Sequence, residues 1–240
     1  MKTSNPVLSS KAFDNLTFTG DAQVMTVQGT VNKTLLLLFL LFISASWIWG
    51  RALVSGGFIW LGLIGGFITA LATVFKKEWA PVTSPLYAVC EGLALGGISA
   101  FMEMQYPGIV TQAVALTFGT LFCLLLAYKA NLIRATEKFK SGIFAATGGI
   151  CLVYIISWLL GLFGFGIPLI HSSGLLGIGF SLFVVGIAAL NLVIDFDFIE
   201  QASANNLPKY MEWYGAFALI VTLVWLYIEI LRLLSKLRRR

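Results

Sequence analysis

The sequence predicts an all-α integral membrane protein that crosses the bilayer seven times. Of its 240 residues, 58% are hydrophobic and only 11% are charged, whereas an ordinary soluble domain carries about 25% charged residues. The mean hydropathy is +0.89. Most of the surface must therefore face lipid, and the short loops leave no room for a sizeable soluble domain.

Seven apolar segments come close to the roughly 17–25 residues that a helix needs to span a bilayer. Five of the six prolines fall between these segments or at their starts, where a missing N–H costs least. Glycines four residues apart, as in Gly62/Gly66 and Gly92/Gly96, predict a close approach of helix backbones. The expected spans are Leu35–Trp49, Gly56–Phe75, Pro85–Met104, Ile109–Tyr128, Gly142–Phe165, Leu175–Ile199 and Trp213–Ser235.

Polarity divides the chain into an N-terminal segment, residues 1–33, and a transmembrane domain, residues 34–240. Lysine and arginine collect in the N-terminal segment and in alternate loops, while the opposite loops hold only Arg51. The positive-inside rule therefore predicts a cytoplasmic N-terminus. The basic tail then lies outside, against the rule, and we expect the first six spans, rather than a re-entrant last helix, to decide the topology. The net charge of +5 fits loops that meet anionic lipid and does not indicate a nucleic-acid partner.

Acidic side chains inside the apolar spans are the candidate functional residues, because a carboxylate in hydrocarbon costs roughly 2.5–3.5 kcal/mol on insertion scales. Asp195 lies near the cytoplasmic end of the sixth span, and Glu229 lies near the middle of the seventh. Glu91 lies about two turns above the cytoplasmic face on the third span. With this orientation the three carboxylates can converge in the cytoplasmic half of the bundle.

Helix periodicity separates the neighbours of Asp195. Asn191 is four residues before it and shares its face, whereas Asp197 points to nearly the opposite side. We therefore predict an interior Asp195 and a headgroup-level Asp197. Asn191, Asp197 and Glu91 are candidates for an ion path, although a structural, hydrogen-bonded Glu91 is an equal alternative.

Two carboxylates held close in a low-dielectric environment do not easily both ionise. Asp195 and Glu229 can therefore share a proton, or jointly hold a hard cation such as Ca²⁺ through oxygen ligands. Loss of a shared proton would push the helices apart and so make a pH-dependent gate; a purely structural pair is the alternative. Lys76 and Lys77 either mark the cytoplasmic boundary or cap the carboxylate site as countercharges. The only histidine, His171, is a weaker candidate for a pH sensor.

Several stretches of the chain resemble one known family, the Bax inhibitor-1 family of transmembrane Bax inhibitor motif proteins, and its bacterial branch in particular. The sixth and seventh spans carry Ala188-Ala189-Leu190-Asn191-Leu192-Val193-Ile194-Asp195 and Leu226-Tyr227-Ile228-Glu229. The third span carries Cys90-Glu91-Gly92-Leu93, and the N-terminal part carries Ser4-Asn5-Pro6 and Met25-Thr26-Val27-Gln28-Gly29-Thr30-Val31. The resemblance covers nearly the whole chain.

The resemblance implies a seven-helix bundle whose last helix is surrounded by the other six. It also implies a pH-sensitive calcium leak channel, in which an acid on the sixth helix and one on the seventh sense protons. Asp195 matches the sixth-helix aspartate, and Glu229 stands where the seventh-helix aspartate is expected. Lys76 or Lys77 stands where a latching arginine is expected, and lysine lacks the bidentate fork of arginine.

Three functions follow from these residues. The leading prediction is a calcium leak channel that is gated by protonation of Asp195 and Glu229. Its expected partners are calcium, protons and the lipid bilayer, and its expected location is a bacterial plasma membrane. The alternatives are a proton-coupled ion transporter and a non-conducting regulator of other membrane proteins. We expect neither an enzyme nor a bound cofactor, because the sequence shows no nucleophile–base constellation, no phosphate-binding glycine motif and no metal-ligand spacing of its three cysteines.

Overall fold

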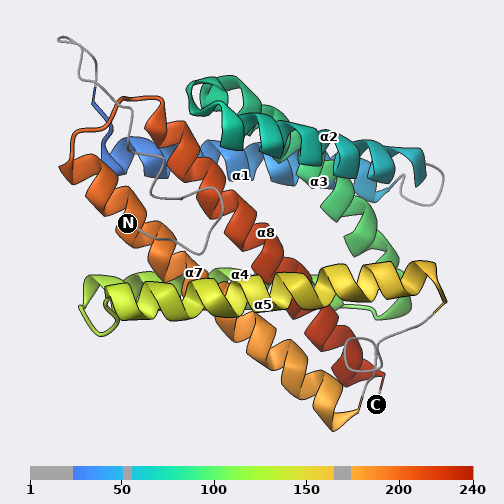
Figure 1. Cartoon of the computed structure of the whole chain (residues 1–240). Coiled ribbons are helices and arrows are strands. Elements are labelled where there is room, and N and C mark those ends of the chain that lie inside the picture. The colour runs from blue at the N-terminus through green and yellow to red at the C-terminus, as the bar shows by residue number, and fades with distance from the viewer. Residues whose placement is uncertain (1–23, 51–55, 165–173, 240) are drawn as a thin grey trace. The chain divides into compact units, whose positions relative to one another are not determined.

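The computed structural model describes residues 24–50, 56–164 and 174–239, and within them it is helical (Figure 1). Seven of its helices are long and apolar enough to cross a membrane, which confirms the predicted fold class. The elements are α1 (Val27–Trp49), α2 (Gly56–Phe75), the short 3₁₀ helix η3 (Lys77–Trp79), α3 (Ala80–Gln105), α4 (Ile109–Lys129), α5 (Glu137–Leu162), α7 (Leu175–Ala204) and α8 (Met211–Arg238).

Several helices extend beyond the apolar segments that predict them. The helix α1 begins at Val27 rather than Leu35, because the Thr26 hydroxyl accepts a hydrogen bond from the backbone N–H of Gly29. Likewise α5 begins at Glu137 rather than Gly142, and the Thr136 hydroxyl caps it. A cap satisfies the free N–H groups of the first turn, so a polar first turn can be helical although hydropathy does not reveal it.

One proline does not mark the start of its span. Pro85 was expected there, but it lies inside α3, which begins at Ala80 with Pro81 in its first turn. Pro85 is close enough to the helix start that its missing N–H removes only one of the early intrahelical hydrogen bonds. The span is therefore longer at its beginning than the proline pattern indicates.

The described chain forms two compact units, and the long helices α7 and α8 each contribute to both. The N-terminal unit comprises residues 24–50, 56–107 and 197–221, and the C-terminal unit comprises residues 108–164, 174–196 and 222–239. Each unit is described by itself below.

In the N-terminal unit, α3 packs against both α1 and α2, and glycines permit the contact. A Cβ atom placed on Gly62 of α2 would lie 2.6 Å from the carbonyl oxygen of Cys90. One placed on Gly96 of α3 would lie 2.5 Å from the carbonyl oxygen of Ala45. No side chain fits at these positions, so the close helix packing expected from the glycine spacing is confirmed.

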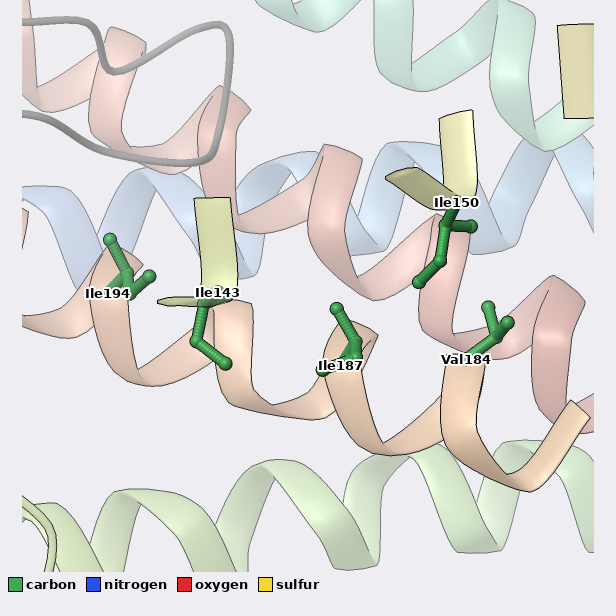
Figure 2. Packing of buried hydrophobic residues seen from close by; sticks show 5 residues of the cluster. All are labelled: Ile143, Ile150, Val184, Ile187 and Ile194. Carbon is green, nitrogen blue, oxygen red and sulfur yellow. The ribbon is translucent and has the colours of Figure 1, made fainter. Parts of the chain in front are cut away.

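In the C-terminal unit, α5 and α7 share an aliphatic core. Ile143 and Ile150 of α5 face Val184, Ile187 and Ile194 of α7, all of them buried, as Figure 2 shows. The spacing of three and seven residues places each set on one face of its helix. This contact fixes the rotation of α5 and α7, and so determines which polar side chains of these helices face α8.

The last helix is the most buried of the seven described spans. In its most apolar window 67% of the residues are buried, against 11% in α5. Its first part contacts α3 through the edge-to-face ring pair of Tyr87 and Phe217, 4.9 Å apart between centroids. Its second part contacts α5 and α7 in the C-terminal unit. The expected role of the last helix as the one that many others contact is therefore confirmed.

Outside these contacts the helices present large apolar side chains. On α2, for example, Trp60, Phe67 and Phe75 are 67%, 65% and 81% exposed. Exposed apolar surface on this scale is untypical of a water-soluble protein. The chain is therefore an integral membrane protein whose outer surface faces hydrocarbon.

Candidate intramembrane carboxylate site

Asp195 is a fully buried carboxylate on α7, with 0% of its surface exposed. The Thr222 hydroxyl of α8 donates a hydrogen bond of 2.6 Å to its Oδ2. One turn earlier on α7, Asn191 donates from Nδ2 to the Thr147 hydroxyl of α5 at 3.0 Å and to the carbonyl oxygen of Ile187 at 2.8 Å. The face that periodicity assigns to Asn191 and Asp195 therefore carries polar contacts to two other helices.

Glu229 is the second buried carboxylate of the C-terminal unit, at 2% exposure. The Tyr154 hydroxyl of α5 lies 3.0 Å from its Oε1 and 3.1 Å from its Oε2. The Arg232 guanidinium, one turn further along α8, lies 3.0 Å from Oε1 through Nη1. Two helices thus supply donors to a carboxylate that hydrocarbon would otherwise surround.

The two carboxylates lie in the same unit but have different partners. Thr222 and Glu229 are seven residues apart on α8, so they share a face and are separated by about 10.5 Å along the axis. The donors to Asp195 include the Thr222 hydroxyl, whereas Glu229 accepts from Tyr154 and Arg232. In this conformation each carboxylate is stabilised by its own set of donors.

A cavity of about 400 Å³ borders the Tyr154 side of this site. Its walls are mostly apolar and come from α5 and α8. Besides Tyr154, they include Thr147, Ile150, Cys151, Trp158 and Trp225. The Tyr154 side chain therefore lines the cavity, and its hydroxyl donates to the Glu229 carboxylate.

The other predicted ion-path acids belong to the N-terminal unit. Glu91 is half-buried on α3, hydrogen-bonded to the Tyr87 phenol, and close to Gly66 of α2. Asp197 is also half-buried, and its Oδ2 accepts a hydrogen bond from Gln201 at 2.5 Å. Of the predicted ion-path residues, Asn191 belongs to the C-terminal unit that holds Asp195 and Glu229.

The predicted latch lysines both contact aromatic rings of the N-terminal unit. The Lys76 ammonium lies 4.4 Å from the ring centroid of Trp79. The Lys77 ammonium lies 5.9 Å from the ring centroid of Tyr214 on α8. Cation–π contacts of this kind stabilise a positive charge, and the Lys77 contact connects η3 to the last helix. The predicted pH sensor His171 lies outside the described residues.

An ion pair that sequence reasoning missed ties the start of α8 to α1. Glu212, only 1% exposed, accepts hydrogen bonds from the backbone N–H of Thr26 at 2.9 Å and from its hydroxyl at 3.0 Å, and it pairs with Lys33. Met25 adds a backbone bond of 2.7 Å to the carbonyl oxygen of Leu207. Met25 and Thr26 are therefore hydrogen-bonded to the connection between α7 and α8 and to the first turn of α8.

Arg232 was also missed, because it was counted with the basic tail. Its spacing of three residues from Glu229 is the signal that could have found it, since such pairs are neighbours on a helix. Tyr154 is distant in sequence from both and left no such signal.

In the connection between α7 and α8, burial and the charge of Glu78 raise the pKa of Tyr210 above its ordinary value.

Among the residues that the structure describes, no three His, Cys, Asp or Glu side chains gather into a metal-binding group. The site contains two acids: Asp195 accepts from the Thr222 hydroxyl, and Glu229 accepts from the Tyr154 hydroxyl and the Arg232 guanidinium. Such a site can hold protons, or transiently accept a hard cation, on oxygen ligands.

Comparison with known proteins points to one family. The family model described as Bax inhibitor 1 like matches residues 5–239. No curated protein and no solved structure gives a significant match to the chain.

Proposed function

The chain belongs to the Bax inhibitor 1-like family, and from this premise we propose that it is a pH-sensitive calcium leak channel in which Asp195 and Glu229 bind the ion and sense protons. Proteins of this family are linked to calcium leak. The observation that carries the proposal is the burial of two carboxylates in the membrane-spanning part of one unit, at 0% and 2% exposure. Intramembrane acids are costly, and they are typical of ion and proton pathways.

Protonation would act on two separate contacts. Ionised Asp195 holds the Thr222 hydroxyl, so α7 is tied to α8. Ionised Glu229 holds Tyr154 and Arg232, so α5 is tied to the same helix. A proton on either carboxylate weakens a charge-assisted hydrogen bond, so pH controls how firmly α8 is held in the C-terminal unit.

Calcium is the proposed permeant ion because its ligands are oxygens. Carboxylate, hydroxyl and carbonyl oxygens suit hard cations, and the contacts of Asp195 and Glu229 are with oxygens and nitrogens rather than sulfur. The excess of basic residues in alternate loops supports a cytoplasmic N-terminus. The plasma membrane of a bacterium is the proposed location because the chain resembles the bacterial branch of the family.

The test is calcium flux into liposomes that contain the purified full-length protein, measured from pH 5 to 8. Wild type is compared with Asp195→Asn and Glu229→Gln, and with Glu200→Gln as a control. Glu200 is the control because it lies five residues from Asp195 on the same helix but is exposed.

A pH-dependent flux that Asp195→Asn abolishes or makes insensitive to pH, and that Glu200→Gln leaves unchanged, is the expected result. Flux that requires an imposed proton gradient would instead favour a proton-coupled transporter. Flux no greater than that of empty liposomes at every pH would refute the channel and favour a regulator of other membrane proteins.

A further inference from the structure

The Arg232 guanidinium is in direct contact with the Glu229 carboxylate. Its Nη1 lies 3.0 Å from Oε1 and 3.2 Å from Oε2, so one nitrogen contacts both oxygens. The same nitrogen donates to the Tyr154 hydroxyl at 2.6 Å, and that hydroxyl lies 3.0 and 3.1 Å from the two carboxylate oxygens. Both oxygens of Glu229 are therefore engaged by an arginine and a phenol.

These are the oxygens that a metal ion would need. Calcium approaches carboxylate oxygens to about 2.3–2.6 Å and collects six to eight oxygen ligands. A guanidinium offers five N–H donors, no acceptor and a charge that proteins do not remove. While Arg232 stays in place, it competes with any cation both for the lone pairs and through charge repulsion.

The two members of the pair differ in their freedom to move. The Glu229 side chain is 2% exposed, whereas that of Arg232 is 36% exposed. The guanidinium also stacks on the Tyr154 ring, with its central carbon 5.0 Å from the ring centroid. The pair can therefore open by rotation of the arginine, which leaves the carboxylate behind in the interior.

Lys236, seven residues after Glu229 on α8, is a second cation near this face, and its charge interacts with those of Glu229 and Arg232. Lys236 is buried and donates to the carbonyl oxygen of Gly177 at 3.0 Å and to the Ser181 hydroxyl at 2.8 Å, both on or next to α7. Asp195 contacts Thr222, about two turns from Glu229. From α5, the titratable group that faces Glu229 is Tyr154. Lys236 therefore acts on Glu229 through its charge, whereas Arg232 is in direct contact with the carboxylate.

We propose that Arg232 is a tethered cation that occupies the Glu229 site and keeps a divalent cation out until the guanidinium turns away. This inference rests on the proposed function, because it specifies how an ion reaches one of the two carboxylates. Arg232 is thus the gate at Glu229, and the freed carboxylate with the Tyr154 hydroxyl forms the oxygen site behind it.

The test is the binding of Tb³⁺, a hard cation of similar size to Ca²⁺, to the purified full-length protein in detergent. Tb³⁺ emission is sensitised by a nearby phenol or indole, and Tyr154 lies 3.0 Å from the carboxylate. The variants are Arg232→Gln, the double variant Arg232→Gln with Glu229→Gln, and Arg238→Gln. The last removes the same charge from the exposed end of α8 and serves as the control.

We expect Arg232→Gln to bind Tb³⁺ at least about tenfold more tightly, because a unit charge no longer competes within a few ångströms of the site. The gain should disappear in the double variant and be absent in Arg238→Gln. No gain in Arg232→Gln, or a gain that survives in the double variant, overturns the inference.

A second comparison needs no change at Arg232, should that variant fail to fold. If the arginine fills the site, then Glu229→Gln alone leaves the Tb³⁺ affinity of the protein unchanged; a loss of affinity overturns the inference. The Tb³⁺ experiment measures binding in detergent, so its result does not depend on whether the protein conducts calcium in liposomes. Liposomes without calcium flux would refute the leak channel, while the Tb³⁺ result would still decide the role of Arg232.

Discussion

Removal of the Glu212 carboxylate should strongly destabilise the N-terminal unit. The substitution Glu212→Ala deletes an acceptor that holds the backbone N–H of Thr26 at 2.9 Å, the Thr26 hydroxyl at 3.0 Å and the Lys33 ammonium. It leaves Lys33, whose side chain is only 17% exposed, without this countercharge. It also frees the residues that begin α1 from the first turn of α8.

The size of the effect follows from burial. Breaking a buried ion pair by removing one partner costs about 3–5 kcal/mol, because the remaining charge is left uncompensated. For a chain of this length, 1 kcal/mol corresponds to a change of roughly 2–4 °C in Tm. Glu212→Ala should therefore lower Tm by roughly 6–20 °C, on the same scale.

The assay is thermal unfolding in detergent micelles, followed by near-UV circular dichroism. The control is Glu78→Ala, which removes an exposed carboxylate from the same unit. Exposed charges contribute about 0–1 kcal/mol, so its Tm should fall by only a few degrees.

A double variant separates the loss of the pair from the loss of packing. Replacing both Lys33 and Glu212 by methionine removes the two charges together, and such apolar replacements are often neutral. We expect it to recover most of the lost stability. If Glu212→Ala is no less stable than Glu78→Ala, or if the double variant is less stable than Glu212→Ala, the reasoning from buried charge is wrong.

Three further substitutions test other contacts. Gly96→Val should lower stability by about 1–3 kcal/mol through overpacking between α1 and α3, whereas Gly119→Ala, where a Cβ meets nothing within 4 Å, should leave Tm unchanged. Thr222→Val should cost about 1–3 kcal/mol by leaving a buried carboxylate without its hydroxyl donor, and Thr222→Ser should restore it; equal Tm values for the two would contradict this. Because the pKa of Tyr210 is raised by burial and by Glu78, its contribution to stability is present below the ordinary tyrosine pKa and is lost as the pH rises through the folded pKa. In a difference titration of phenolate absorbance against Tyr210→Phe, Glu78→Gln should move that pKa down toward its ordinary value, and no movement would contradict the assigned cause.

Much of the fold could be predicted because hydropathy is a sum over neighbouring residues. Seven apolar segments need no knowledge of tertiary contacts, and all seven are helices long enough to span a membrane. The close packing at Gly96 could be predicted for a similar reason, since only small residues allow backbones to touch. The helix starts were less accurate, because Thr26 and Thr136 act as caps at polar positions that hydropathy does not register.

The candidate site could be predicted only in part. Periodicity correctly paired Asn191 with Asp195 on a buried face, since both are almost fully buried. The role of Arg232 was readable from its three-residue spacing to Glu229, but its place near the C-terminus concealed it among the tail charges. The proposed proton-sharing pair stays a prediction, because the structure holds Asp195 and Glu229 with different partners.

The sequence by itself determined that this chain lies in a membrane, how many times it crosses, and which acids are costly enough to require partners, because transfer free energy depends on residue type and local length. Only the tertiary structure decided the partners. Tyr154 meets Glu229 across 75 positions of sequence, and Thr222 meets Asp195 across 27. Such contacts depend on the rotation and register of whole helices. The packing of the Ile143 and Ile187 faces sets both, and no local pattern encodes the result.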